Sequence, residues 1–368
     1  MTYQIVTEDQ TLCIDAGVVV HDGRRPDLVV PFGSGRLYPG LINAHDHLHR
    51  NHYPRLGTPP YANAYEWGDD IHRRHAEQVK RGRGLAREQA LLWGALKNLL
   101  GGVTTVVHHD RWEPAFDYGF PIRVAPVRVA HSLRLEPGIP SLLEPTSPQS
   151  HLPLCIHLAE GGEPAAAAEI HEARRMGLVD ERLIAVHVVS IDSAGVAALR
   201  EAGAAVAWCP TSNEFLFGQT TPRELFDSGI DVLLGTDALL TGQGTLLDEV
   251  RAARRYGYLS DHRLAGAVCA TAARRLAMKA PSLATGNAAD AVLLRRPLWE
   301  AMPADVALVL VDGKPGLADR TAGALFEFLG ISTEELTVGG VPKLVPAPLG
   351  TIARIVAAQW PEAARVLA

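Results

Sequence analysis

Two histidines separated by one residue, His45 and His47, stand at the end of an apolar run that begins at Pro39. In a β-strand, residues i and i+2 point to the same face, so both imidazoles would converge on one point. Such convergence suits a single transition-metal ion. The spacing also fits a polar strand edge in a chain that has 15 histidines. The remaining polar residues must therefore decide between these two interpretations.

Further candidate ligands close other short apolar runs. His157 follows Pro153 to Ile156, His187 follows Leu183 to Val186, and Asp237 comes shortly after Leu234. Imidazole nitrogens with one carboxylate oxygen suit Zn²⁺ or Fe²⁺. One strand-end histidine is weak evidence for a metal site. Several of them at the same end of consecutive strands are a much stronger signal.

Strands and helices alternate over about 240 residues. The run from Ala86 to Leu100 has a helical apolar stripe and ends at Gly101-Gly102, and the unbroken apolar strand Val103 to Val107 follows. Val-rich strands without alternation are typical of a parallel sheet buried on both faces. The pattern predicts a (β/α) barrel, in which sites lie at the carboxyl ends of the strands. An open doubly wound sheet is the alternative, but no Gly-rich nucleotide loop supports it.

The expected strand count falls one short of a full barrel. Seven strands are clear, and residues 111–152 leave room for little beyond the strand Val124 to Ala130 and proline-rich connections. Either short strands lie near Ile122 and before His151, or the barrel is distorted there.

Both chain ends have a different pattern, with short β-like pieces. We expect residues 1–38 and 280–345 to form one small composite β-sandwich domain, residues 39–279 to form the barrel, and residues 346–368 to form a helical tail.

Composition excludes several classes of protein. The net charge is −6 and no basic stripe appears, which argues against a nucleic-acid partner. No apolar run reaches membrane length. The four scattered cysteines form no CxxC pair, and the amino-terminal residues do not read as a signal peptide. We therefore expect a cytoplasmic protein that acts on a small molecule.

The motifs together resemble the amidohydrolase superfamily, in the branch of cytosine, guanine and S-adenosylhomocysteine deaminases and atrazine chlorohydrolase. The matching pieces are PGLINAHDHLH at 39–49, GGVTTVV at 101–107, HLAE at 157–160, the strand ending at His187, WCPTSN at 208–213, LGTDALL at 234–240 and NAADAVLL at 287–294. The resemblance implies a distorted (β/α)8 TIM barrel with a small β-sandwich built from both chain ends. A homodimer is an expectation of the same origin.

The resemblance also implies the roles of the site residues. His45, His47, His157 and Asp237 would hold one divalent metal, with zinc preferred and iron the alternative. Glu160, His187 and Asp237 would be the catalytic residues. A metal makes hydroxide available near neutral pH, and Glu160 could pass the water proton to a ring nitrogen or leaving group. No lysine lies between Lys97 and Lys279, so a bridging carbamylated lysine for a second metal is absent.

The substrate pocket is less well defined by the sequence. The segment 48–84 is polar and aromatic and reads equally as a substrate loop or a surface excursion. Arg50, Arg55, Glu66 and Asp69 within it could meet a charged group, but nothing in the sequence selects among them. Candidate substrate residues are His108, His109, His131, Asn213 and Trp67.

The chain is therefore predicted to be a hydrolase acting on carbon–nitrogen bonds other than peptide bonds. Deamination of a small aromatic N-heterocycle is the main hypothesis. Hydrolysis of a cyclic or linear amide at the same site is the first alternative, and dechlorination also occurs in the branch. A non-catalytic binding protein on a degenerate barrel is a remote alternative, because all six metal and acid–base residues are present.

Overall fold

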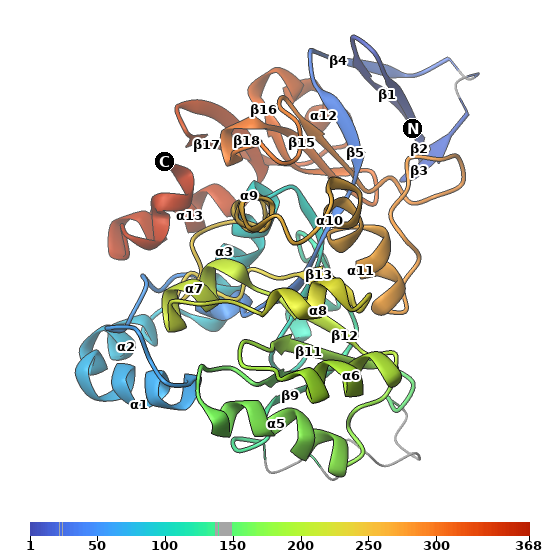
Figure 1. Cartoon of the computed structure of the whole chain (residues 1–368). Coiled ribbons are helices and arrows are strands. Elements are labelled where there is room, and N and C mark those ends of the chain that lie inside the picture. The colour runs from blue at the N-terminus through green and yellow to red at the C-terminus, as the bar shows by residue number, and fades with distance from the viewer. Residues whose placement is uncertain (22, 24, 137–138, 140–148) are drawn as a thin grey trace.

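The computed structural model describes residues 1–21, 23, 25–136, 139 and 149–368. Its strands form two groups. Parallel strands surrounded by helices make up the lower part of Figure 1, and sheets from the two chain ends lie above them. The domain boundaries expected from the sequence remain a prediction, although the two groups of strands fall where those boundaries would place them.

Eight parallel strands follow one another around the lower part. They are β6 (Leu41–Asp46), β7 (Val103–His108), β8 (Arg123–Val124), β9 (Arg128–Ser132), β10 (Leu154–Leu158), β11 (Leu183–His187), β12 (Ala205–Trp208) and β13 (Asp231–Leu234). They pair as β6-β7-β8 and as β13-β12-β11-β10-β9. The backbone N–H groups of Thr236 and Asp237 donate to the carbonyl of His45, which joins β13 to β6. This is the strand order of a distorted (β/α)8 barrel.

The eighth strand lies at one of the two suggested places, next to Ile122, and it takes the first residue of the predicted strand Val124 to Ala130. In the structure, β8 ends at Val124 and β9 begins at Arg128. Pro126 lies between them and has no backbone N–H to continue a ladder. Strands β8 and β9 do not pair, and no helix separates them among the described residues. The other suggested place, before His151, lies largely within residues 140–148, outside the described residues.

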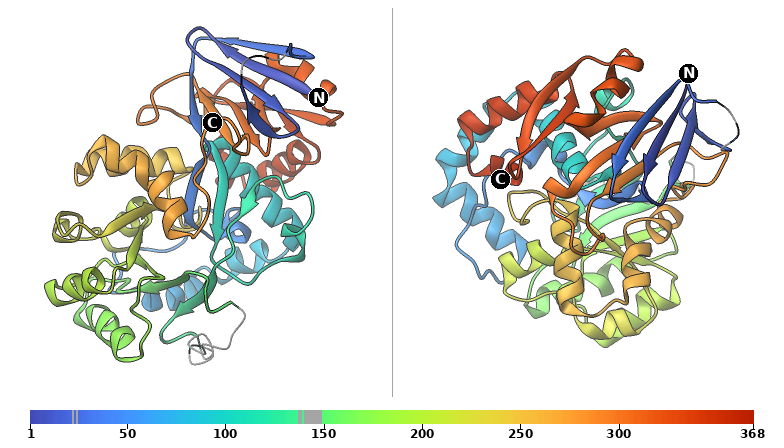
Figure 2. Two further views of the ribbon diagram at one scale, coloured as in Figure 1. Left: turned by 90° about the vertical axis from the view of Figure 1, so that its right-hand side faces the viewer. Right: turned by 90° about the horizontal axis from the view of Figure 1, so that it is seen from above.

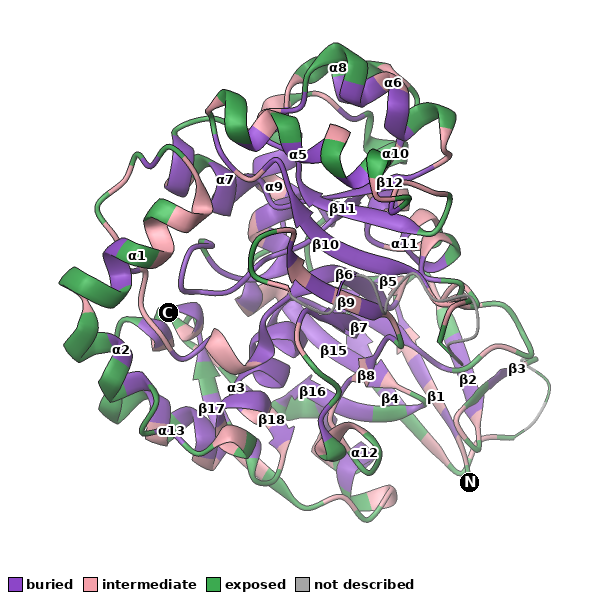
Figure 3. Cartoon of the chain, turned by 90° about the horizontal axis from the view of Figure 1, so that it is seen from below, coloured by how far each residue is buried: buried purple, intermediate pink, exposed green. Residues whose placement is uncertain are grey.

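Helices cover the strands. They are α3 (Arg87–Leu100), α5 (Pro164–Arg175), α6 (Ser193–Glu201), α7 (Pro210–Phe217), α8 (Arg223–Asp227), α9 (Leu246–Tyr256), α10 (Asp261–Ala267) and α11 (Ala270–Arg275). Every residue of β6, β7, β10 and β11 is buried, as expected for parallel strands covered on both faces. Figure 3 shows these buried strands at the centre, with exposed helix faces around them.

The upper part combines both ends of the chain. Its strands are β1 (Thr2–Thr7), β2 (Thr11–Asp15), β3 (Val18–Val20), β4 (Leu28–Gly33), β5 (Arg36–Pro39), β14 (Ala291–Leu294), β15 (Val306–Val311), β16 (Lys314–Asp319), β17 (Thr333–Val338) and β18 (Val341–Pro346). They form the sheets β3-β2-β1-β4 and β17-β18-β16-β15-β14-β5. One apolar cluster joins Tyr3 and Ile5 from the first end to Leu308 and Phe326 from the last. Figure 2 shows these blue and orange segments side by side.

The helices α12 (Gly323–Phe328) and α13 (Leu349–Gln359) complete the carboxyl-terminal part. No helix among the described residues is long and apolar enough to cross a membrane. All four cysteines are free.

The segment 48–84 is largely helical. It contains the short 3₁₀ helix η1 (Leu48–Arg50), α1 (Ala64–Arg74) and α2 (Ala76–Gly82). Helix α3 packs tightly against η1, because a Cβ added to Gly94 would lie 2.4 Å from the carbonyl oxygen of Leu48. This close approach holds η1 directly beside the end of β6, where His47 lies.

Candidate functional site

Four expected metal ligands meet at the carboxyl ends of β6, β10 and β13. Nε2 of His45 lies 3.2 Å from Nε2 of His157 and 3.7 Å from Oδ1 of Asp237. Nε2 of His47 lies 3.5 Å from the same Oδ1. Two nitrogens that bind one tetrahedral zinc ion at about 2.0–2.1 Å are roughly 3.3 Å apart. The observed spacing therefore fits residues that share one ion.

Burial keeps the three imidazoles neutral, which is the form that binds a metal. Burial, followed by the charges of nearby groups, lowers the pKa of His47 and His157 well below the ordinary value. His45, His47 and Asp237 form one group of convergent donor atoms, and His45, His157 and His187 form another. Both groups share His45, so they adjoin one another at the carboxyl ends of the strands.

Asp237 is held with one oxygen toward the histidines. Its Oδ2 accepts hydrogen bonds from Ser212 Oγ at 2.8 Å and Thr241 Oγ1 at 2.6 Å, which leaves Oδ1 facing His45 and His47. Burial opposes ionisation of this carboxyl. The hydrogen bonds from His45 and Thr241 outweigh that effect and hold its pKa well below the usual range. Asp237 is therefore an ionised carboxylate suited to bind a cation.

Glu160 lies beside His187 at the edge of the cluster. Its Oε1 is 3.5 Å from Nε2 of His187. Burial raises the pKa of Glu160 to about 7, partly opposed by the charge of His187. A carboxyl group that titrates near neutral pH can both accept and return a proton during one turnover.

His187 is oriented by a neighbour that the sequence suggested for another role. Oδ1 of Asn213 accepts a hydrogen bond from Nδ1 of His187 at 2.7 Å. The Nε2 atom of this ring points toward Glu160. Asn213 does not line the cavity. Its contact with His187 is that of a residue that positions another side chain.

A buried polar network lies behind the cluster, and the sequence reasoning missed it. Asp46, between the two histidines, accepts hydrogen bonds from Lys97 Nζ at 3.1 Å, Asn98 Nδ2 at 2.7 Å and Asn51 Nδ2 at 2.8 Å. Lys97 also donates to Thr236 Oγ1 at 2.8 Å, next to Asp237. The side chains of Asp46 and Lys97 are fully buried. The available signal was the polar pair Lys97-Asn98 within the apolar last turns of the helix that ends at Leu100.

The cluster forms the floor of a cavity of about 790 Å³. His47, His157, Glu160 and Asp237 line this floor. Most of the wall comes from the segment 48–84, which therefore serves as a cover for the site. Among its lining residues are Arg50, Tyr53, Tyr65, Trp67 and Arg83. Trp67 was an expected substrate residue and Arg50 a residue that could meet a charged group, whereas Tyr53, Tyr65 and Arg83 were not expected there.

The five expected substrate residues separate into two groups. Trp67 and His131 line the cavity, whereas His108, His109 and Asn213 do not. His109 donates from Nε2 to the carbonyl of Ala130 at 3.1 Å, and its ring centroid lies 4.2 Å from that of His157. His109 therefore packs against His157, one of the expected metal ligands, and does not face the cavity in which a substrate would lie.

A further group of possible donors, His49, His108 and Asp110, lies nearby. The backbone N–H of Leu48 donates to Nδ1 of His108 at 3.3 Å, so the hydrogen of this ring sits on Nε2. Arg87 binds Oδ2 of Asp110 at 2.8 Å. Contacts within the protein already use these atoms, and the group reads as part of the cavity support.

Comparisons with known proteins match part of this chain to one family. Residues 148–316 match the amidohydrolase family. The 5-methylthioadenosine/S-adenosylhomocysteine deaminase of Pyrococcus furiosus is 25% identical, with 90% of this chain and 96% of that protein covered. The same enzyme of Symbiobacterium thermophilum is 26% identical over 84% and 89%.

Solved structures show the same fold. A triazine hydrolase variant superposes with a TM-score of 0.72 at 18% identity, with 98% of this chain and 99% of that chain covered. A zinc-bound adenosine deaminase from Xanthomonas campestris superposes with a TM-score of 0.61 at 19% identity, over 89% and 95%. The resemblance inferred from the motifs is thereby confirmed.

Proposed function

The amidohydrolase match and fold are the premise from which we propose that this chain is a metal-dependent hydrolase that deaminates a small aromatic N-heterocycle. The observation that carries the proposal is that His45 lies within 4 Å of both His157 and Asp237, while His47, His157 and Asp237 line one cavity floor with Glu160. We assign the first four residues as ligands of one divalent ion, with zinc preferred. The named deaminase relatives support the choice of reaction.

The bound ion would supply a water molecule of lowered pKa. The protein residues would direct this water. Glu160 takes a proton from it and delivers the proton to a ring nitrogen or to the departing amine. His187, held by Asn213, directs its Nε2 atom toward Glu160 and the attacking water. Water attack at the amino-bearing ring carbon gives a tetrahedral intermediate, which collapses with loss of ammonia.

The cavity wall supports a flat, aromatic substrate. Tyr53, Tyr65 and Trp67 are half-buried and line it. The indole N–H of Trp67 donates to the carbonyl of Leu56 at 2.9 Å, and the hydroxyl of Tyr65 donates to Glu169 at 2.9 Å. These hydrogen bonds fix two rings at the wall, where their faces can stack on a heterocycle.

The test is ammonia release from a panel of purines, including 5-methylthioadenosine, together with pyrimidines, triazines and pterins. Zinc-loaded protein is compared with metal-stripped protein. We expect ammonia from one ring class with the loaded protein alone. The Glu160→Gln variant should bind zinc normally and lose activity by about 10²–10⁴-fold.

Two other results would point elsewhere. Bound zinc without ammonia from any compound would contradict deamination and direct the search to lactams and acyl amides, which need the same residues. Absence of zinc binding would contradict the ligand assignment itself. A cytoplasmic location and a homodimer remain predictions, to be checked by fractionation and by size-exclusion chromatography with light scattering.

A further inference from the structure

Four charged residues of the segment 48–84 could have met a charged substrate, and the structure separates them. Arg55 donates from Nε to the carbonyl of Gly242 at 2.9 Å and covers the ring of Phe215. Glu66 accepts the backbone N–H of Ala62 at 2.7 Å. Neither residue lines the cavity. Arg50 and Asp69 do line it, and Asp69 is exposed.

Arg50 has an unusual position. It is the last residue of η1, three residues after His47, and it is half-buried in the cavity wall. Its Nε donates to Nε2 of His49 at 3.3 Å. Among the described residues, no carboxylate lies within ion-pair distance of its guanidinium. Arg50 lines the same cavity whose floor is formed by His47, His157, Glu160 and Asp237.

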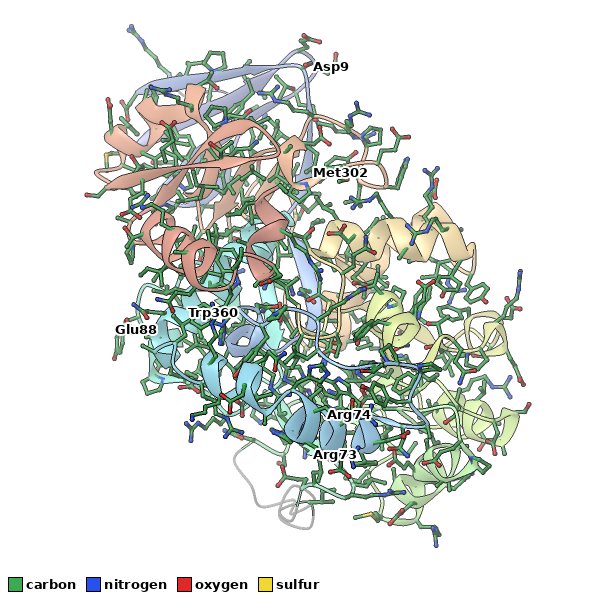
Figure 4. All side chains as sticks on the ribbon, turned by 90° about the vertical axis from the view of Figure 1, so that its left-hand side faces the viewer. Asp9, Arg73, Arg74, Glu88, Met302 and Trp360 are labelled. Atoms are coloured by element: carbon green, nitrogen blue, oxygen red, sulfur yellow. The ribbon has the colours of Figure 1, made fainter. Side chains whose placement is uncertain are left out.

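Other arginines around the cavity are already paired. Arg87 binds Asp110 and Glu113. Arg73 and Arg74, labelled on α1 in Figure 4, both pair with Asp70. Arg83 lines the cavity with no ion pair among the described residues, but it is exposed. Arg50 is thus a half-buried arginine of the cavity wall that has no ion-pair partner among the described residues.

The carboxylates of the cavity do not supply that counter-charge. Asp237 faces the histidines and Glu160 faces His187. Glu169 accepts hydrogen bonds from the backbone of Ala159 and from Tyr65, both at 2.9 Å. A guanidinium offers planar, paired N–H groups that match the oxygens of a carboxylate or phosphate.

We propose that the substrate carries an oxyanion group, a carboxylate or a phosphate, that binds Arg50 beside the reacting ring, with Arg83 adding charge at the cavity mouth. This inference rests on the proposed function, because it concerns the substrate of the same site. A cavity of about 790 Å³ has room for a ring together with a short anionic substituent.

The experiment uses the ring class that releases ammonia and compares three derivatives of it. For a purine these are adenosine, adenosine 5′-carboxylate and adenosine 5′-phosphate, assayed with zinc-loaded protein. We expect kcat/KM of one anionic derivative to exceed that of the neutral compound by about 10–100-fold, as charged hydrogen bonds allow. Which of the two is preferred distinguishes a carboxylate from a phosphate substrate.

The decisive comparison is the ratio of anionic to neutral kcat/KM in three proteins. Arg50→Gln should reduce this ratio by at least tenfold. Arg55→Gln, a nearby arginine outside the cavity, is the matched control and should keep the wild-type ratio. An unchanged ratio in Arg50→Gln would overturn the inference while leaving deamination intact.

A binding measurement covers the case in which no compound is deaminated. Inorganic phosphate and benzoate are titrated calorimetrically into zinc-loaded wild-type and Arg50→Gln protein. Phosphate bound at the metal would appear equally in both proteins. A saturable component that Arg50→Gln lacks supports the anion site, and identical titrations contradict it.

Discussion

Nδ1 of His187 lies 2.7 Å from Oδ1 of Asn213, and this contact decides which ring nitrogen faces the cavity floor. An amide oxygen only accepts hydrogen bonds, so the ring hydrogen must be on Nδ1. The Nε2 atom of the same ring lies 3.5 Å from Oε1 of Glu160. Asn213 comes from α7 and His187 from the end of β11, so two elements set one tautomer.

Replacement of Asn213 by alanine should release this ring. Loss of a residue that orients an active group commonly costs about 10–100-fold, and we expect kcat to fall by that amount. Asn213→Asp keeps an acceptor for Nδ1 and should retain more activity than the alanine variant. Steady-state kinetics with zinc content measured in parallel would check this. A wild-type kcat in Asn213→Ala would contradict the positioning role.

Lys97 and Lys343 provide a matched pair of fully buried lysines. Lys97 binds Asp46 behind the metal-facing histidines, whereas Lys343 binds Asp319 at 2.6 Å in the upper sheets. Removing one partner of a buried ion pair costs about 3–5 kcal/mol, so Lys97→Met and Lys343→Met should both lower the denaturant midpoint.

Zinc affinity should separate the two lysine variants. Asp46 lies between His45 and His47, so only Lys97→Met should weaken zinc binding, by about 10–100-fold. Competition with a chelating dye would measure this. Equal zinc affinity in both variants would show that the network does not support the ligands.

Glu249 should make stability depend on pH. Burial raises its pKa from 4.5 to about 8, partly opposed by hydrogen bonds from Thr211. Between these two values the folded chain holds a proton that the unfolded chain has released, so the contribution of Glu249 to stability falls as pH rises. Glu249→Gln stays neutral throughout. The Tm difference between Glu249→Gln and wild type should therefore increase from pH 5 to pH 8. Parallel curves of Tm against pH for the two proteins would contradict the raised pKa of Glu249.

Gly94 should not tolerate even a methyl group. A Cβ there would lie 2.4 Å from the carbonyl oxygen of Leu48, which belongs to the backbone and cannot turn away. We expect Gly94→Ala to cost about 1–3 kcal/mol despite the higher helix propensity of alanine. Gly68 in α1 has open space at the same atom, so Gly68→Ala should be neutral or stabilising by up to about 1 kcal/mol. Chemical denaturation of both variants compares them directly.

Local patterns were sufficient to predict several elements. The predicted helix Ala86 to Leu100 differs from α3 by one residue, because its apolar stripe and the Gly101-Gly102 end are both local features. The strand ending in His45 and His47 was equally clear. The division between β8 and β9 was missed, since Val124 to Ala130 is apolar throughout except for Arg128 and hides the effect of Pro126.

Contacts between distant residues could not be read from the sequence in the same way. Lys97 resembles an ordinary helix lysine until β6 places Asp46 against it. Asn213 resembles a loop residue until α7 brings it to His187. Arg50 could not be distinguished from Arg55, because their difference lies in partners contributed by other elements.

The cover formed by residues 48–84 has an evolutionary consequence. The expected metal ligands and Glu160 project from strand ends, whereas most of the wall above them belongs to one uninterrupted stretch between β6 and α3. A single exchange of residues 52–84, which spares Asn51 and its hydrogen bond to Asp46, could give the same reaction a different substrate without disturbing the strands. The gene segment encoding it is thus the natural unit of diversification, and the natural piece to transplant when the specificity of this scaffold is engineered.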